Sequence, residues 1–247
     1  MKKSLLFVAA MFAAVGANAQ GLWTNLYGEV EKDAIVFTAG TVVSDKIENL
    51  SITFAGATDW KSVPADGTFT ANGVEYSSGY VQGNTNGMAG GLEHSTGQSS
   101  HIQLVPAVAG TIYVAAKFGN NKPIWAAKVA NAEIEDLDDS DMSAYLYTYE
   151  GKYIKDDGTY GGDEAATDAV FSALPLAVEP GNTYFFWVSG SKLMLCGINF
   201  VAGGTGIENV KAAKNAAEGV AYNLAGQKVG ADFKGIVVKN GVKMIQK

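Results

Sequence analysis

The chain has 247 residues, with 25 acids against 18 lysines, no arginine, one cysteine and a formal net charge of −7. Recognition of nucleic acids depends on arginine forks and basic patches, so this composition disfavours a nucleic-acid partner, and an acidic surface disfavours anionic lipid as well. The one cysteine, Cys196, cannot form an internal disulfide, and its place in an apolar alternation predicts a buried small side chain.

The first 19 residues predict a secretory signal peptide (1–19). Two lysines precede an apolar run over 5–15, and small residues at 17–19 complete a cleavage site between Ala19 and Gln20. We therefore expect export through the periplasm to the outer cell surface or the medium. Cleavage would leave 16 lysines against 25 acids, a net charge of −9. No later apolar run reaches the about 20 residues of a membrane helix, which predicts no transmembrane segment in the mature chain.

Beyond the signal peptide, short apolar bursts separated by Gly, Asn, Asp and Ser predict strands rather than helices. Residues 33–38 and 50–54 are early strand candidates, and Asn72-Gly73 predicts a hairpin turn. Residues 79–100 contain six glycines and few apolar residues, which predicts a long loop. Such loops often carry ligand contacts, and a loop that is only ordered by its neighbours is the alternative.

Two further strands are expected over 102–106 and 110–118, and an acidic run follows over 131–141. Carboxylate oxygens are the ligands that calcium prefers, yet the run lacks the glycine and the glutamate spacing of an EF-hand loop. The alternatives are a structural calcium site and a solvated acidic turn. No other cofactor is expected. The candidate metal ligands are Asp136, Asp138, Asp139 and Asp141.

Tyr145, Tyr147 and Tyr149 alternate along one predicted strand, so their rings should project from the same face. Such a row either packs a sandwich face or offers a platform on which sugar rings stack. With Trp60 and Trp125, these tyrosines are the candidate ligand-binding residues. Exposure of all five rings in one shallow groove would favour a glycan, and burial of all five would favour a protein that contacts another protein.

Residues 174–200 predict three strands joined by turns at 179–182 and 189–191, where proline, glycine and serine supply turn chemistry. The segment 184–188 is apolar on both faces, which predicts a strand that is covered on two sides. A short helix is expected just before this stretch, over 163–173. The pattern as a whole predicts an all-β fold, an antiparallel β-sandwich (jelly-roll-like) over residues 20–201.

After the sandwich the composition changes. The glycine-rich residues 202–206 predict a linker, and 207–247 contain four short strand patterns, the last two separated by the turn signal Asn240-Gly241. A small antiparallel β C-terminal domain is therefore expected. At about 40 residues it is marginal as an independent fold.

Several stretches resemble known modules. Residues 79–87, 102–106, 110–114, 184–193 and 197–200 resemble a secreted β-sandwich found beside polysaccharide-degrading units in bacteria that use type IX secretion. This resemblance implies a carbohydrate-binding-like module. The tail segments 206–210, 222–229 and 234–239 resemble the type A sorting domain of that secretion route, which implies the secretion machinery as a partner of the C-terminal domain.

The sequence contains no recognisable catalytic set. His94 and His101 are its two histidines and belong to no motif, and Ser189 to Lys192 matches a serine–lysine pattern only by letters. Because 25 acids produce many accidental pairs, their number does not indicate glycoside hydrolysis. We therefore expect a non-catalytic binding module for a neutral polysaccharide. The alternative is a surface adhesion or structural protein that contacts another protein.

Overall fold

The computed structural model of the chain describes residues 19–26, 31–83, 100–136, 145–203, 221–223, 228–230, 234–239 and 242–246. The chain divides into two compact units, Met1–Gly203 and Gly204–Lys247. The division falls inside the predicted linker 202–206. The predicted signal segment lies outside the described residues up to position 18, and the expected cleavage point, Ala19 and Gln20, lies at the start of the first strand.

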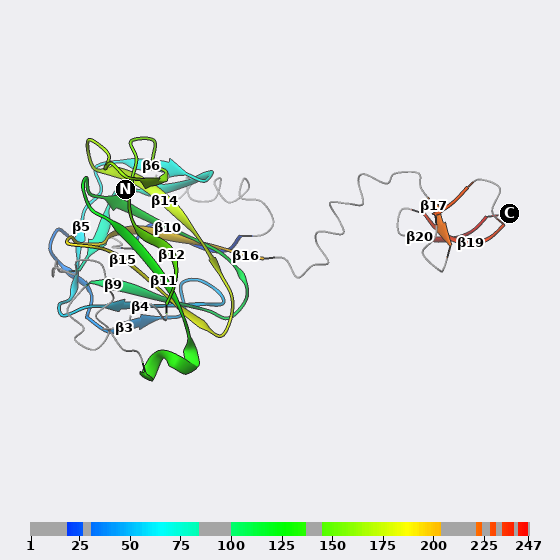
Figure 1. Ribbon diagram of the computed structural model, residues 1–247, viewed down its shortest axis with the longest axis horizontal. Helices are drawn as coiled ribbons and strands as arrows, with labels where there is room; N and C mark the ends of the chain where they lie inside the picture. The colour runs from blue at the N-terminus through cyan, green and yellow to red at the C-terminus, as the bar shows by residue number, and fades with distance from the viewer. Residues whose placement is uncertain are drawn as a thin grey trace, which may run out of the picture. The chain divides into compact units, whose positions relative to one another are not determined.

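The first unit is the predicted all-β sandwich, built from two antiparallel sheets (Figure 1). Sheet A has the strand order β14-β10-β16-β8-β5-β2, with β1 also paired to β16. Its strands are β1 (Ala19–Trp23), β2 (Ile35–Phe37), β5 (Trp60–Val63), β8 (Tyr80–Gln82), β10 (Gly110–Phe118), β14 (Val170–Val178) and β16 (Met194–Ala202).

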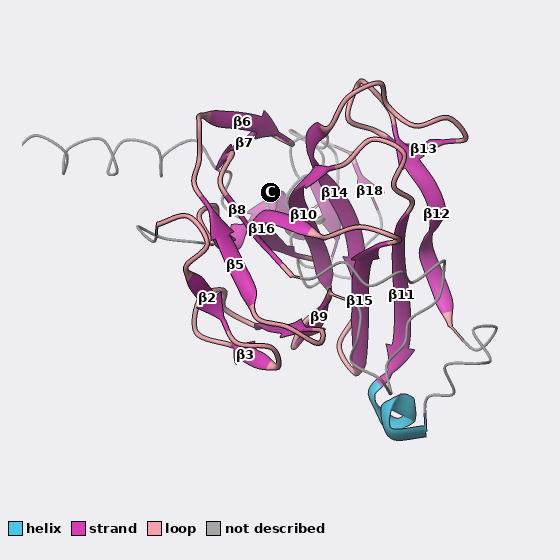
Figure 2. Cartoon of the chain, turned by 90° about the vertical axis from the view of Figure 1, so that its left-hand side faces the viewer, coloured by secondary structure: helices cyan, strands magenta, loops and turns pink. Residues whose placement is uncertain are grey.

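Sheet B has the order β13-β12-β11-β15-β9-β4-β3. Its strands are β3 (Thr41–Val43), β4 (Leu50–Ala55), β9 (His101–Pro106), β11 (Ile124–Ala130), β12 (Leu146–Ile154), β13 (Tyr160–Gly162) and β15 (Asn182–Val188). Figure 2 shows β15, β11 and β12 running side by side, with the helical turn η2 (Asn131–Asp136) at the end of β11.

The core lies between the two sheets and is filled by alternate residues of their strands. Phe54 of β4 and Val114 of β10 are fully buried there. In β15, Tyr184 and Phe186 face this core, whereas Phe185 and Trp187 belong to a second buried cluster on the other face of sheet B. The prediction of a strand covered on two sides is therefore confirmed. Each large side chain buried in this way contributes about 1.5–3 kcal/mol.

The three strands predicted over 174–200 exist, but they do not lie next to one another. β14 and β16 both pair with β10 in sheet A, whereas β15 lies between β11 and β9 in sheet B. The turns at Gly181 and Gly190, with φ of 80° and 61°, therefore carry the chain from one sheet to the other. Turn chemistry predicts where a strand ends, and it does not determine which sheet the next strand joins.

A short hairpin of β6 (Thr68–Ala71) and β7 (Val74–Ser77) covers part of the outer face of sheet A. Its turn has φ of 51° at Asn72 and 73° at Gly73, as a type I′ turn requires, so the predicted hairpin turn is confirmed. Tyr76 of β7 packs on Gly197 of β16, where a Cβ atom would lie 2.9 Å from the ring. Cys196 is buried beneath this hairpin, as predicted, and burial raises the pKa of its thiol to about 12.

One local prediction is wrong, and a second is wrong at its first residues. Residues 163–173 form no helix, because the chain bends after β13 and residues 170–173 pair with β10 as the start of β14. The predicted loop 79–100 begins with a strand, β8, whose Val81 faces the core, and residues 84–99 lie outside the described part.

Among the described residues, no helix has the length and apolar character needed to cross a membrane.

The second unit is a small antiparallel sheet in the order β18-β17-β19-β20. Its strands are β17 (Ala221–Asn223), β18 (Lys228–Val229), β19 (Gly235–Lys239) and β20 (Val242–Gln246). They fall at the four strand patterns read from the sequence.

One tyrosine ties the two sheets of the sandwich together. β14 is the edge strand of sheet A, and edge strands leave backbone groups unpaired. The Tyr149 hydroxyl, which comes from β12 in sheet B, donates to the Pro175 carbonyl of β14 at 2.5 Å. The Asn72 side chain donates to the Ala173 carbonyl two residues earlier, at 2.7 Å. These two hydrogen bonds occupy carbonyl groups of β14, and Pro175 has no backbone N–H to donate. Much of this edge therefore cannot pair with another strand.

We predict that Tyr149→Phe lowers the free energy of unfolding by roughly 1–2 kcal/mol, because the Pro175 carbonyl loses its donor. Denaturant unfolding of the full chain measures this change. Tyr153→Phe is the matched control, since Tyr153 lies on the same strand and its hydroxyl makes no hydrogen bond with the described residues. Equal stability of the two variants would contradict a bridging role for Tyr149.

Candidate functional site

The outer face of sheet B carries a group of rings, here called the outer aromatic cluster. Its members are Trp125, Tyr145, Tyr147, Phe185 and Trp187. Trp125 of β11 pairs directly with Trp187 of β15, and their rings stack with centroids 6.0 Å apart and planes 9° apart. Tyr147 of β12 packs edge-on against Trp125 at 5.7 Å. Such pairs add about 0.5–1.5 kcal/mol each beyond simple burial.

A β-bulge in β12 decides which tyrosines belong to this cluster. Ala126 lies opposite Tyr149 and Ala127 lies opposite Tyr147, so Thr148 is an extra residue on β12. An extra residue reverses the alternation of side chains beyond it. Tyr147 therefore points outward, whereas Tyr149 points into the core, where it packs against Tyr160. The prediction that Tyr145, Tyr147 and Tyr149 project from one face is wrong for Tyr149.

A second bulge, at Gly151, makes room for the Trp125 ring. Gly151 has φ of 73°, and a Cβ atom at this position would lie 2.4 Å from Trp125. The Tyr160 hydroxyl accepts hydrogen bonds from the backbone N–H groups of Glu150 and Lys152, at 2.7 and 3.1 Å. The bulge is therefore hydrogen-bonded on both sides of the glycine, and Trp125 rests directly on the backbone of β12.

The structure separates the five aromatic residues predicted to bind a ligand. Trp60 is fully buried in the sandwich core and its indole N–H donates to the Ala55 carbonyl at 3.2 Å. Tyr145 and Tyr149 are also buried, with 5% and 6% of their surface exposed. Trp125 and Tyr147 are half-buried and contact each other. Of the predicted set, these two therefore offer accessible ring surface at one place.

The sequence analysis did not identify Trp187 as part of a site, because a strand that is apolar on both faces is predicted to lie in the core. Neither the Trp187 nor the Trp125 indole N–H has a hydrogen-bond acceptor among the described residues, although both nitrogens are buried. Buried donors are normally paired, so two adjacent unpaired donors are unusual. Burial raises the pKa of Tyr147 to about 12, which reflects how far its hydroxyl is withdrawn from water.

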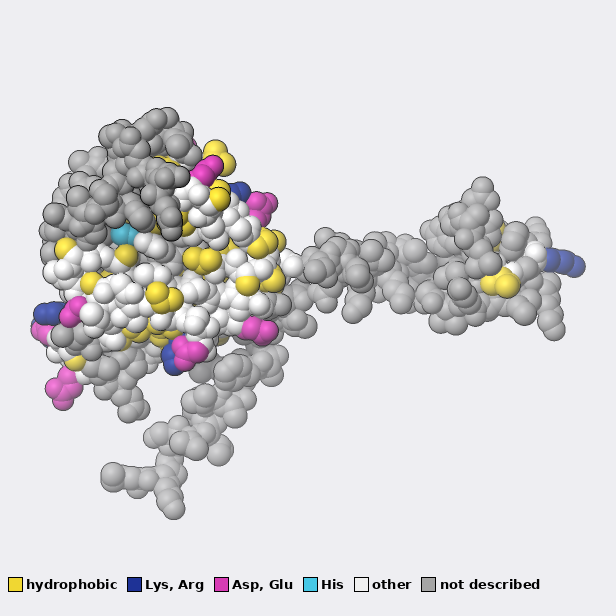
Figure 3. All heavy atoms as spheres, turned by 90° about the horizontal axis from the view of Figure 1, so that it is seen from below, with side chains coloured by type: hydrophobic (Ala, Val, Ile, Leu, Met, Phe, Trp, Pro, Cys, Tyr) yellow, Lys and Arg dark blue, Asp and Glu magenta, His cyan; other side chains and the backbone are white. Residues whose placement is uncertain are grey.

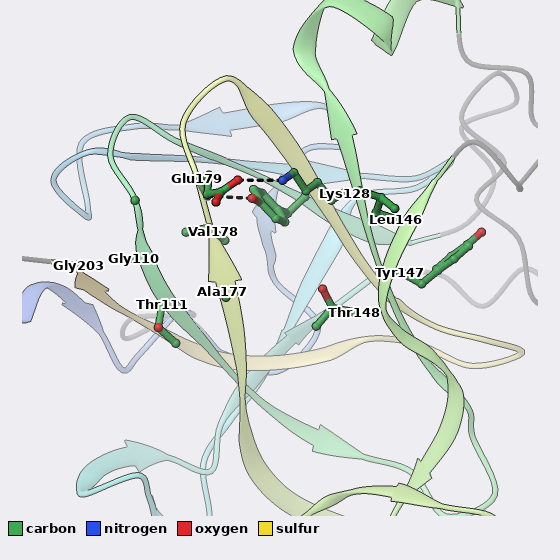
Figure 4. A pocket seen from close by; sticks show the side chains of 12 residues that line it. Gly110, Thr111, Lys128, Leu146, Tyr147, Thr148, Ala177, Val178, Glu179 and Gly203 are labelled. Atoms are coloured by element: carbon green, nitrogen blue, oxygen red, sulfur yellow. Dashed lines mark hydrogen bonds and ion pairs between the residues drawn. The ribbon is translucent and has the colours of Figure 1, made fainter.

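Next to this cluster, a groove of about 510 Å³ opens between β14 and strands β11 and β12. Lys128 and Glu179 point toward each other there and form an ion pair of 2.9 Å, while the Tyr147 ring points away from them (Figure 4). The hydrogen bond to Glu179 raises the pKa of Lys128. Leu146, which is 68% exposed, adds an apolar side chain to the lining.

The groove residues do not form an acid–base pair of the kind used in glycoside hydrolysis. Glu179 is the one carboxylate among the lining residues, and its partner is a lysine. His101 is buried on the outer face of sheet B, where its ring lies 5.9 Å from Phe185 and its Nε2 lies 3.2 Å from the Gln103 amide. His94 lies outside the described residues.

Only one of the four predicted metal ligands lies among the residues that the structure describes. Asp136 is the last residue of η2, and Asp138, Asp139 and Asp141 lie outside the described residues. Within the described ranges, no group of three or more His, Cys, Asp or Glu side chains is placed to hold a metal ion.

In the acidic loop that follows β12, the carboxylates organise the chain. Asp156 accepts from the Thr167 N–H at 2.8 Å, and Asp157 accepts from the Thr159 N–H at 2.9 Å. Asp163 pairs with Lys152. These contacts give three carboxylates of the loop a role in holding its backbone and side chains in place.

Comparison with known proteins finds no protein-family model that matches the chain and no curated protein that matches it in sequence. What the site can bind therefore follows from its own geometry.

We predict that Gly151→Ala disturbs the site as well as the fold. A positive φ costs an alanine about 1–2 kcal/mol, and a Cβ atom pressing on Trp125 adds a packing cost of about 1–3 kcal/mol. Gly40→Ala is the matched control, because Gly40 has φ of 83° and no atom within 4 Å of its Cβ position. Unfolding free energies and tryptophan fluorescence measure both variants. A spectrum and a stability equal to those of the control would contradict the packing of Trp125 on Gly151.

Proposed function

We propose that this protein is a non-catalytic binding module for a neutral polysaccharide, secreted or held at the outer cell surface, and that Trp125 and Tyr147 form its contact surface. The observation that carries the proposal is the pair of half-buried rings, Trp125 and Tyr147, which contact each other on the outer face of sheet B. Aromatic faces stack on the apolar faces of sugars, and the Tyr147 hydroxyl can exchange hydrogen bonds with sugar hydroxyls.

Charge favours a neutral ligand. A net charge of −9 after signal removal, from 16 lysines and 25 acids, repels a polyanion at a distance. Two stacking rings supply about 1 kcal/mol each beyond burial, and association itself is costly. The expected affinity is therefore weak, roughly millimolar to micromolar, as suits a module that relies on repeated contacts along a polymer.

The proposal also includes export through the C-terminal segment. One observation and two sequence-based expectations support it. The observation is the division of the chain into two compact units after Gly203. The expectations are the signal peptide and the resemblance of the tail to a type IX sorting domain.

A surface adhesion or structural protein is the second candidate. The burial of Trp60, Tyr145 and Tyr149 favours it, because these rings stabilise the fold instead of facing a ligand. On the described part of the face drawn in Figure 3, however, the hydrophobic side chains lie in small scattered groups among other side chains and backbone. Protein interfaces usually centre on a contiguous apolar patch, so this face does not favour a protein partner.

We predict that the full chain is retarded in affinity gels containing hydroxyethyl cellulose, xyloglucan or galactomannan. Trp125→Ala and Tyr147→Ala should each weaken retardation about fivefold, because each removes about 1 kcal/mol of stacking. Tyr153→Ala is the matched control, as a half-buried tyrosine of the same strand outside the cluster. Circular dichroism checks that each variant is folded. Lack of retardation on every glycan, or equal loss in the control, would favour the adhesion candidate.

We predict that deletion of residues 204–247 leaves a sandwich that unfolds cooperatively and is not delivered to the cell surface. The two units have separate sheets, so the sandwich should retain its core. Denaturant unfolding of the shortened chain measures cooperativity, and surface proteolysis of cells measures delivery. Normal delivery of the shortened chain would remove the sorting role, and a non-cooperative transition would show that the sandwich needs its tail.

A further inference from the structure

The outer face of sheet A carries a row of side chains that the glycan proposal does not use. Direct cross-strand pairs join Lys61 to Gln82, Gln82 to Met194, Met194 to Lys117, and Lys117 to Phe171. Residues directly opposite each other share a face, with Cβ atoms about 5 Å apart. The row therefore crosses β5, β8, β16, β10 and β14 in order. Figure 2 shows β5, β8 and β16 near one another on the side of the sandwich that carries the β6–β7 hairpin.

The two ends of this row differ in how they are covered. At one end, Phe171 packs with the β6–β7 hairpin, and the Lys117 ammonium lies 5.2 Å from the Phe171 ring and 6.0 Å from the Tyr80 ring. At the other end, Lys61 and Gln82 line a hollow of about 270 Å³ together with Lys192, from the turn before β16. Thr58, Asp59 and Gly83 complete the lining.

The hollow is positive in a protein that is otherwise acidic. Two lysines and one aspartate give its lining a formal charge of +1, whereas the whole chain carries −7. Asp59 is already engaged, since its Oδ1 accepts the backbone N–H of Ala39 at 3.0 Å. Lys61 and Lys192 form no ion pair with the described residues. Their ammonium groups, the Gln82 amide and the Thr58 hydroxyl all supply hydrogen-bond donors to one small space.

From this arrangement we infer that the hollow formed by Lys61, Gln82 and Lys192 binds a sugar carboxylate, as in a uronic acid unit. A carboxylate accepts hydrogen bonds from both ammonium groups, and the amide and hydroxyl donors suit ring oxygens and hydroxyls. The volume is just below the 300–1,000 Å³ typical of small-molecule sites, which suits one sugar unit. The net charge of the chain repels a polyanion and tolerates a single carboxylate on an otherwise neutral glycan.

This site is independent of the outer aromatic cluster. The hollow lies on the outer face of sheet A and the cluster lies on the outer face of sheet B, with the core between them. Loss of the aromatic contacts should therefore leave carboxylate binding unchanged. Conversely, loss of the lysines should leave retardation by neutral glycans unchanged.

The test is a titration of the isotope-labelled full chain with galacturonic acid, followed by backbone amide shifts in NMR spectra at low salt. Lys61→Gln and Lys192→Gln should each weaken binding about fivefold, since a partly exposed charge pair is worth up to about 1 kcal/mol. Raising the ionic strength to 0.15 M should also weaken it, because the screening length falls to about 8 Å. Lys155→Gln is the matched control, an exposed lysine of the β12–β13 turn without an ion pair in the described residues.

Saturable shifts with galacturonic acid that weaken in both lysine variants and persist in Lys155→Gln and in Trp125→Ala would support the site. Galactose is the neutral comparison and inorganic phosphate is the comparison for a phosphate group. Equal binding of galactose would overturn the carboxylate requirement, and tighter binding of phosphate would reassign the hollow to phosphate groups. Absence of galacturonic acid binding, or binding unaffected by Lys61→Gln and Lys192→Gln, would overturn the inference.

Discussion

Strand β15 buries both of its faces, and the arrangement of the rest of the sandwich depends on this constraint. Tyr184 and Phe186 anchor the core between the sheets, while Phe185 and Trp187 require cover on the opposite side of sheet B. A sheet with one solvated face could not hold this strand at its centre. The second layer of rings, with Trp125 and Tyr147 at its accessible edge, follows from the need to cover Phe185 and Trp187.

The bulges of β12 convert that cover into a candidate binding surface. Without the extra residue Thr148, Tyr147 and Tyr149 would share a face, and sheet B would lose either a core ring or an outer ring. With it, Tyr149 closes the gap to sheet A and Tyr147 meets Trp125. Bulges often redirect a side chain near a functional site. Here one extra residue gives neighbouring tyrosines separate structural and surface roles.

The sequence predicts much of the fold, because strand and turn signals are local. Alternation located the inward face of β4, and Asn72-Gly73 located a hairpin from two residues with positive φ. In β16 the alternation is broken by a bulge, so that Cys196 faces outward whereas Ile198 and Phe200 face the core. Alternation did not predict that Tyr149 faces inward, because a bulge depends on how many residues the partner strand places opposite it. Nor did it separate Trp60 from Trp125, since a tryptophan in a strand suits a core and a surface equally well.

The two candidate sites are less predictable than the fold, because each depends on which strands, distant in the sequence, lie next to each other in a sheet. Lys61, Gln82 and Lys192 are separated by many residues and meet only because β8 lies between β5 and β16. The Trp125–Trp187 stack likewise requires β11 to pair with β15. Periodicity assigns a residue to a face of its own strand. The order of strands in the sheet then decides which residues on that face meet.

Close packing of aromatic rings against glycine residues stabilises this chain, which cannot form an internal disulfide. Its one cysteine is buried, so layers of side chains must hold the sandwich together. Tyr76 lies on Gly197 to fix the hairpin on sheet A, and Trp125 lies on Gly151 at the outer aromatic cluster. Each contact brings a ring against backbone where a Cβ atom would intrude. Because the same packing supports the fold and the candidate site, Trp125 is held in place by the protein itself, which would lower the ordering cost of the proposed binding.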